Sequence, residues 1–160
     1  MIYLIVIIHQ IELSIKDFFL TENYKQVLLA RFRNKTHIAR TFGMELSFDE
    51  KDRGIITMPY NPDLDHGERG IHGGIVATLL DTVGWFTCAL AHGGPVITTE
   101  MSIHFLHKAV ATELKARGDI LNLGRKQVIA KMQCWDEKGI RISYATGTFL
   151  IISSMDKLKG

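Results

Sequence analysis

The chain of 160 residues has few of the features that mark specialised classes of protein. Its two cysteines, Cys88 and Cys134, lie far apart and outside any Cys-x-x-Cys pattern, which gives no sign of a disulfide framework or a zinc site. No run of five or more like charges occurs and the net charge is +2, so a nucleic-acid partner is not expected. We predict a protein of the reducing cytoplasm.

Long apolar runs are also missing. Residues 2–8 are apolar, but they are far fewer than a membrane span needs, and they lack the basic flank and small-residue cleavage site of an export signal. We interpret them as a buried strand or an apolar docking segment, and we expect no membrane partner. Residues 12–42 have an irregular helical pattern that indicates packing and not chemistry, and Gly43 is available as a stop signal.

The chain is long enough for one domain with a core, and 46% of its residues are apolar. Alternation over 44–48 and 55–58 around a turn-like stretch predicts a hairpin. A helical pattern over 74–91 is apolar nearly all round, which predicts a buried helix. Short turns separate extended segments at 96–106, 112–121, 126–135 and 140–151, so these strands should be antiparallel neighbours.

These patterns predict an α+β fold in which one long central helix is wrapped by an antiparallel sheet of five or six strands. We divide the chain into an N-terminal apolar and helical extension (1–37), one domain (38–153) and a tail (154–160). No internal repeat, linker or low-complexity tract appears.

The start of the central helix is a candidate site. His72-Gly73-Gly74 precedes it, and glycines there allow a ligand to approach the unpaired amides of the first turn, where the helix dipole is positive. Gly-Gly before a helix is also common as simple chain reversal. The additional feature is Asp81, a carboxylate in the middle of a helix expected to be buried, where an unpaired charge is costly. Asp81 is therefore either a satisfied core carboxylate or a general base or nucleophile.

The spacing of these two features constrains the assembly. Gly73 and Asp81 are eight residues apart, which is roughly 12 Å along a helix. An attacking group must lie about 3 Å from the carbonyl carbon whose oxygen the amides hold. One chain cannot supply both groups to one substrate, so if both act, a symmetric dimer with two interfacial sites is predicted. The strand at 96–106 is the expected pairing edge.

The segment from Ile71 to Gly84, followed by Thr98-Thr99-Glu100-Met101-Ser102, resembles the PaaI-type hotdog thioesterases. The resemblance covers roughly residues 38–152. It implies a hotdog fold and cofactor-independent hydrolysis of acyl-CoA at a subunit interface, in dimers or dimers of dimers. It also implies that Asp81 activates water or attacks directly, and that the amide of Gly73 polarises the thioester carbonyl.

Other site residues follow from the same resemblance. Thr98 matches a Ser or Thr that assists the aspartate, with Thr99 as the alternative. His66 stands where the family often has Asn or Gln, so it donates to the oxyanion, favours another acyl group as a cation, or lies in a solvated loop. We interpret His72 as support for the loop, with Gly74 beside it in the substrate site. The acyl group is not predicted.

The CoA phosphates need cationic partners, and His107, Lys108, Arg125 and Lys126 stand near the strand ends where the resemblance places the nucleotide. Each of them is also an ordinary surface residue. A metal site built from Asp65, His66 and His72 matches no common zinc spacing, so no metal is predicted.

Two other functions compete with hydrolysis. Asn61-Pro62-Asp63-Leu64-Asp65-His66 superficially resembles the Asp and His of hotdog enoyl-CoA hydratases. A non-catalytic acyl-CoA binding protein would keep the fold without turnover, but it has no need of a costly carboxylate at Asp81.

Overall fold

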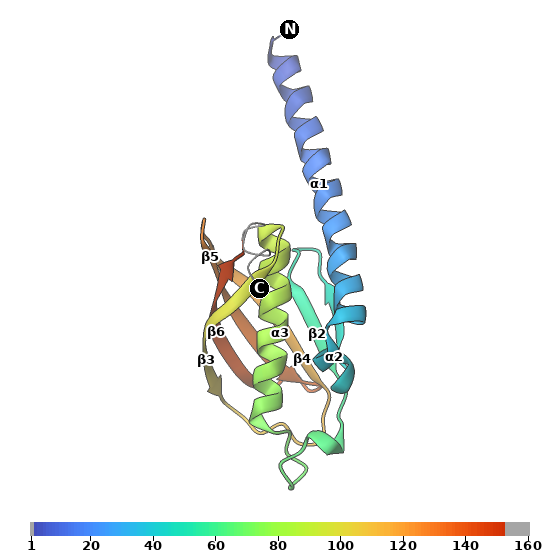
Figure 1. Cartoon of the computed structure of the whole chain (residues 1–160), viewed down its shortest axis with the longest axis vertical. Helices are drawn as coiled ribbons and strands as arrows, with labels where there is room; N and C mark the ends of the chain where they lie inside the picture. The colour runs from blue at the N-terminus through green and yellow to red at the C-terminus, as the bar shows by residue number, and fades with distance from the viewer. Residues whose placement is uncertain (1, 153–160) are drawn as a thin grey trace.

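The computed structural model describes the backbone of residues 2–152 and the side chains from Phe19 onward, so the predicted tail at 154–160 lies outside the described residues. A long helix packs against a curved six-stranded sheet, as Figure 1 shows. In chain order the elements are α1 (Ile2–Lys35), α2 (His37–Thr41), β1 (Glu45–Phe48), β2 (Gly54–Met58), the short 3₁₀ helix η1 (Pro62–Leu64), α3 (Gly73–His92), β3 (Val96–Phe105), β4 (Leu114–Leu123), β5 (Gln127–Asp136) and β6 (Arg141–Ile151).

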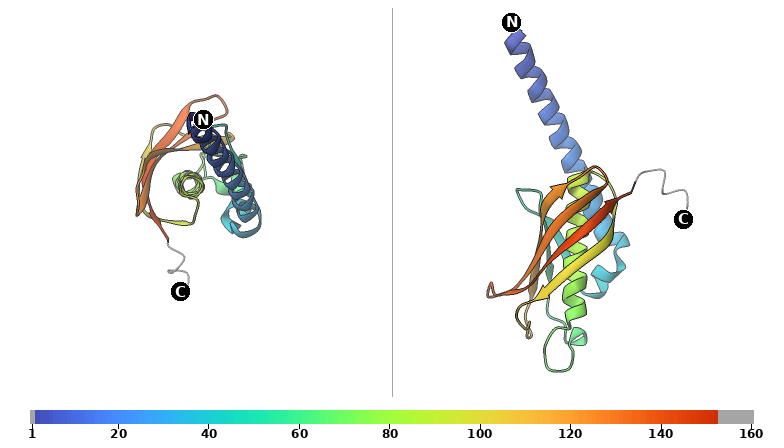
Figure 2. Two further views of the ribbon diagram at one scale, coloured as in Figure 1. Left: turned by 90° about the horizontal axis from the view of Figure 1, so that it is seen from above. Right: turned by 90° about the vertical axis from the view of Figure 1, so that its left-hand side faces the viewer.

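The sheet has the order β1-β2-β4-β5-β6-β3, and all five neighbouring pairs are antiparallel. The predicted α+β architecture, the hairpin β1–β2 and the antiparallel strands are confirmed. In the left view of Figure 2, the sheet curves round α3, which is seen nearly end-on. Strand β3 lies at one edge of the sheet, with β6 as its one neighbour among the described strands.

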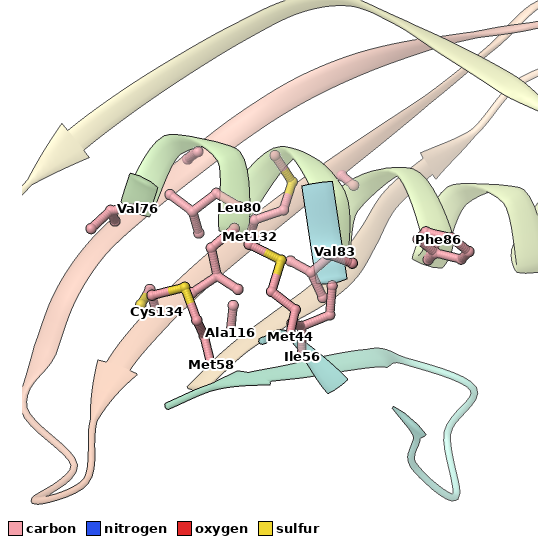
Figure 3. Close-up of a cluster of buried hydrophobic side chains, with 14 of the residues drawn as sticks. Met44, Ile56, Met58, Val76, Leu80, Val83, Phe86, Ala116, Met132 and Cys134 are labelled. Atoms are coloured by element: carbon pink, nitrogen blue, oxygen red, sulfur yellow. The ribbon is translucent and has the colours of Figure 1, made fainter. Parts of the chain in front are cut away.

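Helix α3 is defined at both ends. His72 caps its N-terminus, and Gly93 closes the C-terminus in the left-handed region, at φ 77°, where glycine is favoured. Gly84 allows close contact with the sheet, because a Cβ there would lie 2.6 Å from the Phe149 ring. Figure 3 shows the resulting core, in which Leu80 and Val83 of the helix meet Met132 of β5.

Among the described residues, α3 is the one helix with the length and apolar composition of a membrane span. Its place in the core explains that composition, because 61% of the apolar window is buried inside the fold.

The N-terminal segment is helical from Ile2, so the prediction of a strand at 2–8 is wrong. A short apolar run does not distinguish a strand from a helix by periodicity. In Figure 1 the first half of α1 projects beyond the rest of the molecule. The second half is anchored to the domain by Leu28 and Phe32, which are 1% and 3% exposed, and the Phe32 ring meets Phe86 of α3 edge-on at 5.2 Å.

Both cysteines are free and buried, and burial raises the pKa of Cys88 and of Cys134 to about 12. The reactive species is the thiolate, so at pH 8 both thiols are almost entirely protonated in the folded chain. We expect no reaction with Ellman's reagent in the native protein and two reactive thiols in guanidinium chloride. Rapid labelling of the native protein would contradict this burial.

Candidate active site

The turn before α3 is held by the side chain of His72. Its Nδ1 accepts a hydrogen bond from the Gly74 amide at 3.0 Å, and its carbonyl accepts from the amide of Ile75 at 2.9 Å. His72 thus acts as an N-cap, with φ −61° and ψ 135°. This bond requires Nδ1 to carry no proton.

The amide of Gly73 remains available. It has no hydrogen-bond partner among the described residues, whereas the amides of Gly74 and Ile75 are both used. Gly73 lines a cleft of about 350 Å³ whose walls include His66, Phe105 and Lys108. A free amide in the first turn of a 20-residue helix can stabilise negative charge on a bound oxygen.

Asp81 lies eight residues further along α3, in contact with β3. Its Oδ1 accepts a hydrogen bond from Thr98 Oγ1 at 2.8 Å, and its Oδ2 has no partner among the residues described. One carboxylate oxygen is therefore fixed and the other is free. The neighbouring Thr99 points elsewhere, because its hydroxyl donates to the carbonyl of Thr148 at 3.0 Å.

Asp81 is half-buried, which corrects the expectation of a fully buried helix. Asp81 belongs to one face of α3, whose residues follow each other at spacings of three or four. None of the residues on this face is buried, namely Gly74, Ala77, Thr78, Asp81 and Trp85. The sheet covers the opposite face. Asp81 thus stands on the stripe of α3 that the sheet leaves open.

Asp81 lines its own cleft of about 530 Å³, together with Trp85 and Ile97. This cleft and the one at Gly73 have no lining residue in common among those that the structure describes. Within one chain the carboxylate and the free amide therefore face separate spaces, as expected for groups roughly 12 Å apart on a helix.

One wall of the Asp81 cleft was missed by sequence reasoning. The end of α1 and the start of α2 supply Arg31, Lys35 and His37 to it. We expected this region to provide packing alone. A signal was present in the sequence, because three cations stand close together at 31–35, but cations are common in the last turn of any helix.

His66 is exposed in the loop before α3 and lines the Gly73 cleft. Its ring lies directly over Gly70, where an added Cβ would be 2.3 Å from Nε2. His66 and Gly73 are therefore brought to one cleft, on the side away from Asp81.

The four cations expected to bind phosphate do not form one group within the chain. Lys108 follows the end of β3, and its neighbour His107 bonds the Arg141 carbonyl through Nδ1 at 2.8 Å. Lys126 and Arg125 lie near the start of β3, since the Lys126 carbonyl accepts from Ile151, which pairs with Val96. The length of β3, roughly 30 Å, separates the two pairs.

Within the part of the chain that the structure describes, no group of three or more His, Cys, Asp or Glu side chains is placed to hold a metal ion. Asp65, considered above as a ligand, accepts a hydrogen bond from the Tyr60 hydroxyl at 2.8 Å. That bond raises the pKa of Tyr60 above its usual value.

Comparisons with known proteins show what this chain is similar to. The sequence model of the thioesterase superfamily matches residues 70–143. A protein of Saccharolobus solfataricus, provisionally named esterase SSO2140, is 21% identical over 129 residues, which cover 80% of this chain and 92% of that protein.

Solved structures agree on the fold. The Escherichia coli PaaI protein, from the phenylacetic acid degradation operon, is 20% identical with a TM-score of 0.75 and covers 84% of this chain and 96% of its own. The thioesterase HI1161 of Haemophilus influenzae is 21% identical with a TM-score of 0.72 and covers 81% of this chain and 90% of its own. The resemblance to PaaI-like proteins is confirmed. The chain has the hotdog fold, and its residues 70–143 are similar to the thioesterase superfamily.

Proposed function

We propose that the protein hydrolyses acyl-CoA thioesters to a free acid and CoA. The observation that carries this proposal is the state of the Asp81 carboxylate, which stands in a cleft with one oxygen held by Thr98 and the other free. A carboxylate fixed in this way can take a proton from water or attack a carbonyl carbon. The similarity of residues 70–143 to the thioesterase superfamily supports a thioester as the group attacked.

The reaction needs an acceptor for developing charge. Attack by water on the thioester carbon, with Asp81 taking the proton, places negative charge on the carbonyl oxygen. The free amide of Gly73 supplies a hydrogen bond to that oxygen. Collapse of the tetrahedral intermediate breaks the C–S bond, and the CoA thiolate leaves with the proton held by Asp81. In the alternative, Asp81 forms an anhydride that water then hydrolyses.

Both groups reach one substrate only when two chains meet. Asp81 lies beside Thr98 of β3, to which it is hydrogen-bonded. Gly73 lies beside Phe105 of the same strand, because a Cβ on Gly73 would contact the Phe105 ring at 3.5 Å. We infer that β3 pairs antiparallel with β3 of a second copy, so that Phe105 of each chain lies opposite Thr98 of the other. Each Gly73 then faces the other chain's Asp81.

The β-bulge in β3 supports a centre for this proposed pairing at Ser102. Seven residues from Thr98 to Phe105 have partners in β6, since Thr99 is skipped, and Ser102 is the fourth of the seven. A two-fold axis at Ser102 places Met101 opposite Ile103 of the second copy. Both of these are half-buried and pack against the core.

On the outer face, the same register places exposed Glu100 opposite exposed His104 of the second copy. A carboxylate opposite an imidazole is a favourable cross-strand pair. The same register places Lys108 of one chain near the start of β3 of the other chain, where Lys126 lies. Cations that are far apart within one chain are therefore close together in the dimer. A dimer of dimers also brings Gly73 of one chain to Asp81 of another, because it contains the same dimer.

Ser102→Cys is the direct test of this register. Residues directly opposite each other in antiparallel strands have Cα atoms about 4.5–5.5 Å apart, which is within the range that a disulfide bridges. We expect nearly complete conversion to a covalent dimer under mild oxidation, measured on a non-reducing gel.

Ile97→Cys is the matched control for this crosslink. It introduces an exposed thiol on the same strand, far from the proposed axis, and should stay monomeric on the gel. The native cysteines do not interfere because they are buried. Crosslinking by Ile97→Cys and not by Ser102→Cys would overturn the register.

The proposed activity is tested by thiol release from a panel of short-chain, medium-chain and aromatic acyl-CoA esters. Hydrolysis should release one free thiol per ester cleaved. Crotonyl-CoA separates the alternatives, because a hydratase removes the enoyl absorbance without releasing thiol. Binding of every ester without any turnover would instead identify an acyl-CoA binding protein.

A further inference from the structure

The cleft beside Asp81 has cations on the wall that α1 provides. Figure 2 shows α1 lying beside α3, on the side that the sheet leaves open. Leu28 and Phe32 are fully buried between α1 and the domain and hold this wall in place. Arg31 and Lys35 belong to the same two turns of α1 and line the cleft.

Arg31 is positioned by an aromatic ring. Its guanidinium carbon lies over the ring of Trp85, 5.3 Å from the ring centroid. The ring itself is fixed, because the indole N–H donates to the carbonyl of Val96 at 2.7 Å. Stacking of this kind orients the guanidinium plane and leaves its N–H groups free to bind an anion.

Neither cation is neutralised by the protein. Among the side chains described, Arg31 and Lys35 form no ion pair, whereas Lys25, Arg53 and Arg117 do. Among the residues that the structure describes, Asp81 is the one acidic residue on the wall of the cleft, and its hydrogen bond is to Thr98, not to a cation. Two unpaired cations therefore face a cleft in which a substrate is expected.

We propose that Arg31 and Lys35 bind an anionic group of the substrate in the cleft beside Asp81, and this inference rests on the proposed thioesterase function. The anion is either a carboxylate at the far end of the acyl group or a phosphate of CoA. The geometry favours the carboxylate. Trp85 lies one turn beyond Asp81, roughly 6 Å along the helix, so a short acyl group attacked at Asp81 extends toward Arg31.

Other cations are available for the CoA phosphates. Lys108 and His66 line the Gly73 cleft, and the proposed register places Lys108 near Val96 of the second copy, at the end of β3 where Lys126 of that copy also lies. If Lys108 and Lys126 hold the CoA phosphates, Arg31 and Lys35 remain for a carboxylate on the acyl portion in the cleft of Trp85. The substrate class is then a short dicarboxylic acyl thioester.

The test compares glutaryl-CoA with butyryl-CoA in the double variant Arg31→Gln/Lys35→Gln. We expect kcat/KM for glutaryl-CoA to fall about tenfold, the loss typical of a charge-assisted hydrogen bond at a partly exposed site, with a change under about twofold for butyryl-CoA. Arg33→Gln is the matched control. It removes one positive charge from the same helix, between the two test positions, but does not line this cleft, so it should change neither value.

The source of the anion is resolved by repeating the assay with glutaryl and butyryl thioesters of pantetheine, which lack the nucleotide. A loss specific to glutaryl esters on both carriers assigns Arg31 and Lys35 to the acyl carboxylate. An equal loss for both CoA esters, absent with both pantetheine esters, assigns them to the phosphates. No change with any of the four esters overturns the proposal, provided that the melting temperature of the variant is unchanged.

A binding measurement separates this inference from the proposed function. Titration calorimetry of glutaryl-CoA and butyryl-CoA into Asp81→Asn needs no turnover. Tighter binding of glutaryl-CoA, lost when Arg31 and Lys35 are also replaced, supports the anion site even if the unsubstituted protein hydrolyses neither ester. Hydrolysis of both esters with no role for Arg31 or Lys35 supports the enzyme and overturns the anion site.

Discussion

Asp81→Asn is expected to lower kcat/KM for acyl-CoA hydrolysis by about a thousandfold, the range that general acid–base catalysis supplies. The amide has nearly the shape of the carboxylate and keeps an oxygen that can accept the hydrogen bond from Thr98, which is 2.8 Å from Asp81 in the structure. It cannot take a proton from water or attack the thioester. The loss should appear in kcat, because the cleft that binds the substrate is unchanged.

Three measurements make this result specific to the carboxylate. Glu137→Gln, which removes an exposed carboxylate from the β5–β6 turn, should leave hydrolysis unchanged. The melting temperature of Asp81→Asn should stay close to that of the unsubstituted protein, since Asp81 is only half-buried and forms no ion pair among the described residues. Acyl-CoA should still bind. Full thiol release by Asp81→Asn would remove Asp81 from the mechanism.

The sequence predicted the elements of the domain better than the packing of its extension. Alternation and helical periodicity are local properties, so α3 and the strands β1 to β6 were placed within about two residues of their observed bounds. The order β1-β2-β4-β5-β6-β3 depends on long-range contacts that periodicity does not record. The helical state of residues 2–8 was missed for a related reason, because an apolar run that short is compatible with either state.

Residues of the candidate site could be predicted from the sequence where they depart from a local pattern. Asp81 is a carboxylate in an otherwise apolar helix. Gly73 stands at the start of that helix, at a position where most residues would carry a side chain. Arg31 and Lys35 fit the pattern of their own helix. Their place beside Asp81 depends on how α1 packs against α3, which the sequence pattern does not record. The half-exposed stripe of α3 was hidden for the same reason, since it depends on which face the sheet covers.

Gly73→Pro is expected to lower kcat by about a hundredfold to a thousandfold, the cost of losing one oxyanion donor. Proline removes the amide N–H, which is the group proposed to hold the thioester oxygen. The substitution suits this position, because Gly73 is the first residue of α3 and His72 before it has ψ 135°, the extended conformation that precedes proline.

Gly73→Ala is the matched control for Gly73→Pro. It adds a side chain but keeps the amide, and its Cβ would lie 3.5 Å from the Phe105 ring, which is ordinary van der Waals contact. We expect Gly73→Ala to retain most of the activity. Equal losses in the two variants would indicate that space, and not the amide, matters at Gly73.

Mixing the two inactive variants then tests whether the site is shared between chains. A heterodimer of Gly73→Pro and Asp81→Asn subunits has one site with both defects and one site with an intact Asp81 and an intact Gly73 from different chains. Random exchange makes half of the dimers heterodimers, so about a quarter of the original activity should return after joint refolding. If each chain carried its own complete site, the mixture would stay as inactive as its components, and the shared-site mechanism would be wrong.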